Sequence, residues 1–261
     1  MNERTSQDEG GERGSPLRIS VAGRLAGHCR RHYAAWSHAL PFLAWLALMG
    51  GLDLPVFGPP HPWKYAVRTF VCLALFLYFR PWRWYPALAW RNMVWAVLVG
   101  IGVFVVWTYP AVPWGGQYTG WQEWYVRFGI LPLGRLPDPE SGMIYDPSLA
   151  GWPMALIRLA GSAFVIAVIE EFFWRGFLYR WLIDRNFLRV SLNRVDWEAV
   201  GIVCLLFGLA HMEWLVGIAT GFVYLWLMIK TRDVWAVAVA HVITNLLLGI
   251  YVLVNGAYIF W

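Results

Sequence analysis

Seven long apolar stretches limit this chain to one kind of fold. A helix needs roughly 17 to 25 apolar residues to cross the hydrocarbon core of a bilayer, where the backbone must satisfy its own hydrogen bonds. Hydrophobic residues make up 59% of the chain and charged residues only 14%, well below the quarter or so that is usual in a soluble domain. The sequence therefore predicts an all-α, polytopic membrane bundle of about seven transmembrane helices, near residues 37–53, 65–80, 92–109, 153–174, 198–212, 214–230 and 234–254.

The distribution of basic residues predicts the orientation of these helices. Lys and Arg concentrate in the cytoplasmic loops of membrane proteins. If all seven stretches cross, one side receives Lys64, Arg127 and Arg135, and the other receives most of the remaining Lys and Arg residues. We therefore expect a cytoplasmic N-terminus. The net charge of +5 then reflects topology and contact with anionic membrane lipids, and it indicates no nucleic-acid partner.

The chain divides into a polar tail and a membrane domain. Residues 1–36 are rich in Gly, Ser and Arg and lack the compact apolar core and cleavage site of a secretory signal. We expect them to form a disordered, basic cytoplasmic tail, followed by an integral membrane domain over residues 37–261. The three cysteines are scattered, so they predict neither a disulfide framework nor a metal site.

One long connection, residues 110–152, is rich in Gly, Pro and Trp. Indole rings prefer the interface between membrane and water. We interpret this segment as lying in the outer interface, with a substrate-binding lid as the alternative.

Two adjacent carboxylates stand inside the fourth apolar stretch. On a helix, residues four apart share a face, so Glu171 can pair with Arg175. Glu170 points elsewhere and has no cation on its own helix, because the residue four positions on is Trp174. An ionisable side chain within a membrane helix is costly unless something in the interior receives it, which makes Glu170 a functional candidate.

Three further polar residues lie within later stretches at a similar depth. His211 ends the fifth stretch, and His241 and Asn245 share one face of the seventh. Each alone has a structural explanation, as a hydrogen-bonded interior group or an interhelical contact. Together with Glu170 they supply a base, two imidazoles and an amide on three helices. We expect them to meet in one cavity that opens to the cytosol.

These residues resemble the motifs of a known family, the CPBP or abortive-infectivity family of intramembrane glutamic endopeptidases, which includes the type II CAAX prenyl proteases. The family pattern EExxxR, FxxxH and either HxxxN or HxxxD stands here as Glu170, Glu171 and Arg175; Phe207 and His211; and His241 and Asn245. The resemblance covers roughly residues 153–254, the expected catalytic core. The length, the tryptophan content and the long outer loop also resemble the CAAX-protease-related proteins of bacterial exosortase systems.

The resemblance implies a glutamic-type hydrolase that uses no metal or other cofactor. Glu170 and His211 would activate water, His241 and Asn245 would stabilise the oxyanion, and Glu171, Arg175 and Phe207 would support them. It also implies a hydrophobic or lipid-bearing peptide substrate, a bacterial inner membrane location and an exosortase-system partner. Peptide hydrolysis needs these same parts: a water, a group that takes its proton, and donors to the oxyanion.

Two other readings of the same residues stay open. His211, His241 and Glu170 form a ligand set that catalytic zinc sites use, which would give a zinc-dependent membrane hydrolase, although no HExxH motif is present. Alternatively, a non-enzymatic immunity, scaffold or transport protein could use the buried carboxylate and imidazoles as a relay or packing network.

Overall fold

The computed structural model describes residues 21–112, 119–131, 133–134 and 142–261, with the backbone alone for residues 21–31. All regular elements in these ranges are helical. Five helical segments are long and apolar enough to cross a membrane: His32–Leu52, Trp90–Ala111, Trp152–Ile183, Trp214–Thr231 and Val234–Asn255. The prediction of an all-helical membrane bundle is confirmed.

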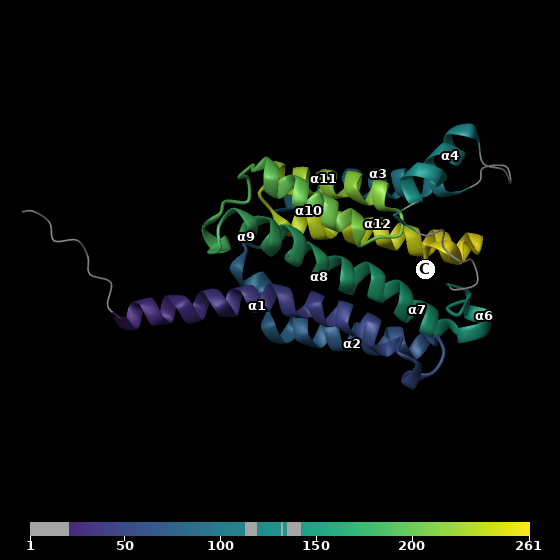
Figure 1. The fold of residues 1–261 in the computed structure, drawn as a ribbon, viewed down its shortest axis with the longest axis horizontal. Coiled ribbons are helices and arrows are strands. Elements are labelled where there is room, and N and C mark those ends of the chain that lie inside the picture. Colours follow the sequence, from purple (N-terminus) through teal and green to yellow (C-terminus); the bar gives the residue numbers. More distant parts are fainter. Residues whose placement is uncertain (1–20, 113–118, 132, 135–141) are drawn as a thin grey trace, which may run out of the picture.

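The bundle is built in three layers, which Figure 1 shows from the side. The pair α1 and α2 forms one outer layer, the continuous run from α7 to α9 lies in the middle, and α3, α10, α11 and α12 pack on its other side. The main helices are α1 (Val21–Leu52), α2 (Pro62–Phe79), α3 (Met93–Ala111), α7 (Trp152–Ala160), α8 (Ala167–Glu171), α9 (Tyr179–Ile183), α10 (Trp197–Leu209), α11 (Trp214–Thr231) and α12 (Val234–Asn255). The long connection contributes the short helices α4 (Gly120–Tyr125) and α6 (Pro147–Ala150).

The number of membrane spans and the start of the first helix differ from the sequence predictions. All seven apolar stretches are helical, but seven membrane crossings are not confirmed, because α10 has only 13 residues and α2, which contains Lys64 and Arg68, is not among the five spans. The tail is also shorter than expected. Residues 21–36 belong to α1, and they contain four Ala and three Arg, which favour helix. The prediction for residues 1–20 lies outside the described part of the chain.

The middle layer is one helical run of 32 residues, Trp152–Ile183, with two wider turns. The π-helical segments η6 (Gly161–Ile166) and η7 (Phe172–Leu178) flank α8, which carries both adjacent glutamates. Such π-bulges are rare within α-helices and are frequent at functional sites. They change which residues of this run share a face around α8.

Close backbone approaches hold the helices around α8. A Cβ atom on Gly100 of α3 would lie 2.6 Å from the Ala240 carbonyl oxygen of α12, and one on Gly217 of α11 would lie 2.9 Å from the Cα of Gly208 in α10. Only glycine allows these contacts, as expected for packing between membrane helices. At the start of α12, the Asp233 carboxylate accepts hydrogen bonds from the Trp235 amide and from the Asn92 side chain. The register of α12 against its neighbours is therefore fixed.

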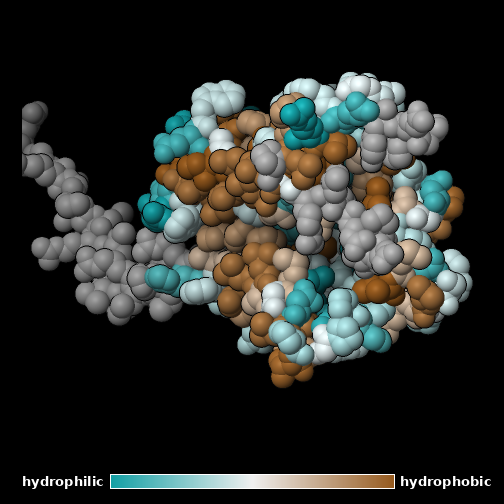
Figure 2. All heavy atoms as spheres, turned by 45° about the vertical axis from the view of Figure 1, so that its right-hand side comes forward, coloured by the Kyte–Doolittle hydropathy of each residue, from teal (hydrophilic) through white to brown (hydrophobic). Residues whose placement is uncertain are grey.

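The outer surface of the bundle is apolar along its sides. Figure 2 shows apolar residues over a broad area, with hydrophilic residues gathered toward the edges. On α3, Val94, Leu98, Ile101 and Val105 are exposed at helical spacing, which is the pattern of a face turned toward lipid.

Candidate functional site

A cavity of about 320 Å³ lies between the middle layer and helices α3, α10, α11 and α12. Its lining includes all four residues that the sequence analysis proposed as catalytic: Glu170, His211, His241 and Asn245. The size falls in the usual range for sites that take small ligands or short peptide segments. The structure thus brings the four candidates to one cavity from α8, from α12 and from the bend after α10, where His211 lies just beyond the helix that was expected to contain it.

Glu171 is committed to a buried ion cluster. Its Oε1 accepts a hydrogen bond from Arg175 at 3.0 Å and one from Nδ1 of His241 at 2.8 Å. Both Glu171 and Arg175 are fully buried. The Arg175 guanidinium lies 4.2 Å from the centre of the Phe207 ring and donates to the Gly221 carbonyl at 3.4 Å. The cluster therefore ties α8 to α10, α11 and α12.

Glu170 has a different environment from its neighbour. It lines the cavity, and among the described residues it forms no hydrogen bond or ion pair. The i,i+4 spacing that gives Glu171 its cation leaves Glu170 facing the cavity, as the sequence predicted. Its carboxyl group is free to bind a water molecule or a substrate.

The hydrogen bond of His211 fixes its tautomer. Nδ1 lies 2.6 Å from the carbonyl oxygen of Phe207, one helical turn earlier. A carbonyl oxygen can only accept, so Nδ1 carries the hydrogen and Nε2 is left with a lone pair. The rings of Phe207 and Trp107 pack against the imidazole, with centroids 4.7 and 5.3 Å away. His211 therefore presents a proton acceptor in a fixed position.

His241 and Asn245 are each oriented by a hydrogen bond to a neighbouring residue. Because Nδ1 of His241 donates to the Glu171 carboxylate, its Nε2 is the atom left for the cavity. The Asn245 amide nitrogen donates to the Ser162 carbonyl at 2.9 Å, which leaves its second N–H available. The ring of Tyr224 lies 5.1 Å from that of His241, and its hydroxyl donates to Thr244 at 2.7 Å.

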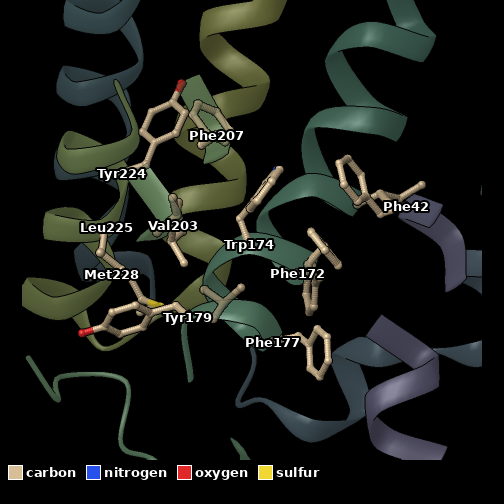
Figure 3. Packing of buried hydrophobic residues seen from close by; sticks show 14 of the residues in the cluster. Phe42, Phe172, Trp174, Phe177, Tyr179, Val203, Phe207, Tyr224, Leu225 and Met228 are labelled. Carbon is tan, nitrogen blue, oxygen red and sulfur yellow. The ribbon is translucent and has the colours of Figure 1, made fainter. Parts of the chain in front are cut away.

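The cavity extends from Glu170 toward one end of the bundle. Arg158, Met212 and Trp261 line it there, at the end that carries α4, α6 and the chain end marked C in Figure 1. The other half is filled by a tight core, in which Figure 3 shows Phe172, Trp174, Phe177, Tyr179, Val203, Leu225 and Met228.

This geometry brings two expectations into conflict, the cytoplasmic N-terminus and the cavity that opens to the cytosol. With a cytoplasmic N-terminus, the filled half is the cytoplasmic half. A cavity open to the cytosol is therefore incompatible with that orientation, because bulky aromatic and aliphatic side chains occupy the space where such an opening was expected.

Sequence reasoning missed several residues that line the cavity, among them Ser162, Thr220, Tyr224 and Thr244. Small polar residues in membrane helices are common at packing contacts, so nothing singled them out. It also missed Glu213, which lies in the bend between α10 and α11, is a buried part of the lining and accepts a hydrogen bond from Tyr125 at 3.0 Å. An acidic residue between two short apolar stretches was the sequence signal that could have identified Glu213.

The metal reading gains no geometric support. Within the described ranges, no three His, Cys, Asp or Glu side chains are placed to hold a metal ion.

The fold and site define a helical membrane protein with a buried acid, two histidines and an amide at one cavity. Residues 152–247 match the model of a family described as type II CAAX prenyl endopeptidase, Rce1-like. No match was found among curated proteins or solved structures. The matched segment contains every residue of the three motifs. Over this segment, which is less than half of the chain, the protein is similar to the CAAX protease family.

Proposed function

We propose that this protein is a glutamic-type intramembrane endopeptidase in which Glu170 is the general base. The proposal rests on the different environments of the two adjacent carboxylates. Glu171 is neutralised by Arg175 and His241, whereas Glu170 lines the cavity with His211, His241 and Asn245. A carboxylate kept free of partners beside two imidazoles can take a proton from water.

Two hydrogen-bond acceptors of the site can bind and orient the attacking water. A water molecule has two hydrogens, and the Glu170 carboxylate and Nε2 of His211 can each accept one of them. The water oxygen then presents a lone pair to the carbonyl carbon of the scissile peptide. Glu170 takes a proton during attack and returns it to the departing amine, so that protons balance over the cycle.

The other side of the site supplies donors to the oxyanion. The second N–H of Asn245 is one available group, and Nε2 of His241 is a second donor when it carries a hydrogen. Donors that are already oriented need little rearrangement in the transition state. Here the contacts with Ser162 and Glu171 provide that orientation.

The apolar surroundings suggest the class of substrate. We propose a peptide segment that is hydrophobic or carries a lipid, because it can partition into the membrane beside the cavity. Membrane lipids are then the constant partners of the protein. A bacterial inner membrane location and an exosortase-system partner, which the sequence resemblance implied, stay predictions of the same proposal.

The experiment is cleavage by the purified protein and its Glu170→Gln variant, which keeps the shape of the side chain. The probe is a set of lipid-bearing peptides reconstituted with the protein in lipid nanodiscs. We expect the variant to lose at least about a thousandfold in kcat while its thermal unfolding stays unchanged. Glu123→Gln, at an exposed position of α4, is the matched control and should cleave normally. Undiminished turnover by the Glu170 variant would end the proposal.

The zinc alternative has its own measurement. We expect prolonged dialysis against a chelator to leave cleavage intact. Loss of activity that added zinc restores would replace the glutamic mechanism with a metal-dependent one.

A further inference from the structure

Arg158 is the one Lys or Arg side chain among the described residues that line the cavity. It lies on α7, near the end of the bundle toward which the cavity extends. No carboxylate lies within ion-pairing distance of it in the described part of the chain, and its Nε–H is buried without an acceptor. Arg158 is half-buried, and a guanidinium group with a donor shielded from water normally has an anionic partner; this one has an unused donor next to a substrate-sized space.

Aromatic rings hold the guanidinium in place without neutralising it. The centre of the Tyr65 ring lies 4.4 Å from its carbon, that of Tyr145 lies 5.4 Å away and that of Trp261 lies 5.6 Å away. Stacking of this kind favours the cation and orients its planar fork of donors. The fork matches a carboxylate, which can accept two parallel hydrogen bonds.

The spacing between Arg158 and Glu170 sets the length of what can lie between them. The two residues are on the same continuous helical run, Trp152–Ile183, and both line the cavity. Their separation of twelve positions corresponds to roughly 18 Å along a helix axis. An extended peptide covers that length in roughly five residues, or fewer once the Arg and Glu side chains reach inward.

We propose that Arg158 binds the C-terminal carboxylate of the substrate, so that the cavity accepts a free chain end and Glu170 cuts about three to five residues before it. The inference rests on the proposed peptidase function and names the residue that selects a chain end over an internal segment. Arg158 is a binding residue for substrate and takes no part in proton transfer.

The test measures binding separately from cleavage. The protein carries Glu170→Gln so that no turnover occurs, and it is reconstituted in phosphatidylcholine nanodiscs. The probe is a fluorescent prenyl-cysteine peptide that ends in three apolar residues, made once as the free acid and once as the carboxamide. We expect the acid to bind at least about tenfold more tightly than the amide, as a charged hydrogen-bonded pair would provide.

Adding Arg158→Gln to this protein should remove the difference between acid and amide while leaving the affinity for the amide within about twofold. Arg158→Lys should retain part of the difference. Arg68→Gln is the matched control, because Arg68 also stacks on Tyr65 but lines a neighbouring, smaller cavity; it should leave the difference intact.

Three results would overturn the inference. One is equal binding of acid and amide when Arg158 is present, and another is equal loss of affinity for both peptides in Arg158→Gln, which marks a structural role. The third is a response of Arg158→Gln only to phosphatidylglycerol in the nanodisc, which would assign the guanidinium to a lipid phosphate. Binding with acid selectivity but no cleavage by the unsubstituted protein would instead count against the peptidase.

Discussion

Oε1 of Glu171 lies 2.8 Å from Nδ1 of His241, joining two helices across 70 positions of sequence. The same oxygen accepts from Arg175 at 3.0 Å. One carboxylate thus neutralises a cation and sets the ring orientation of a cavity histidine. This arrangement gives the second glutamate of the pair a positioning role, distinct from that of Glu170.

Glu171→Gln should destabilise the protein strongly, because it leaves the Arg175 charge buried without compensation. Removing one partner of a buried ion pair typically costs about 3 to 5 kcal/mol. The double variant Glu171→Gln with Arg175→Met should lose clearly less than the sum of the two single losses. Reversible unfolding in detergent, followed by tryptophan fluorescence, measures the coupling, and strictly additive losses would show that the pair does not act as a unit.

Asn245→Ala should lower kcat by about a hundredfold to a thousandfold with little change in KM, because it removes a donor that acts mainly on the oxyanion. Asn255→Ala, at an exposed position near the end of α12, is the matched control. Steady-state kinetics on any cleaved peptide gives both constants. A change confined to KM would assign Asn245 to ground-state binding of the substrate.

The direction of the cavity predicts which side of the membrane reaches it. Met212 lines the cavity and is exposed, so Met212→Cys should react in intact cells with a maleimide that cannot cross membranes. Ser191→Cys, at an exposed position in the loop between α9 and α10, should react only after lysis. Both variants are made with Cys29 replaced by Ala, and Cys72 and Cys204 are buried. The reverse pattern would place the N-terminus outside.

Glu213 should make stability depend on pH. Burial raises the pKa of Glu213 from 4.5 to about 7, so the folded protein holds a proton that the unfolded chain releases. The stability from this group is fully present below about pH 4.5 and is lost as pH rises through about 7, by an amount of roughly 3 kcal/mol. Between pH 5 and 8, unfolding temperatures of Glu213→Gln should therefore fall less than those of the unsubstituted protein. Glu123→Gln, which is exposed, should follow the unsubstituted protein, and parallel curves for all three would contradict the assignment.

The helices and the charge pairing could be predicted from the sequence because both depend on local spacing. Apolar length places the helical stretches, and the i,i+4 rule finds Glu171 and Arg175 while leaving Glu170 unpaired. Contacts between distant segments follow from packing, which spacing does not reveal. The bond between His241 and Glu171 and the one between Asn245 and Ser162 are of this kind.

Other features depend on the way the bundle is filled. The π-helical turns on both sides of α8 leave no clear mark in the apolar pattern. The direction of the cavity depends on which half holds the larger side chains, and the rings of Phe172, Trp174 and Phe177 decide it. The positions of the four polar residues along their helices indicated a common depth in the membrane. They could not indicate which end of the bundle contains the cavity.

The filled half has a consequence for the cell that houses this protein. The run from Phe172 to Ile183 corresponds to roughly 18 Å of helix and is packed among aromatic and aliphatic side chains, with Arg175 and Arg180 buried among them. An ion would have to shed its hydration to pass such a layer, at a high cost in free energy. The cavity can therefore admit water to the depth of Glu170 without opening a path through the bundle, so that the electrochemical gradient across the membrane is preserved.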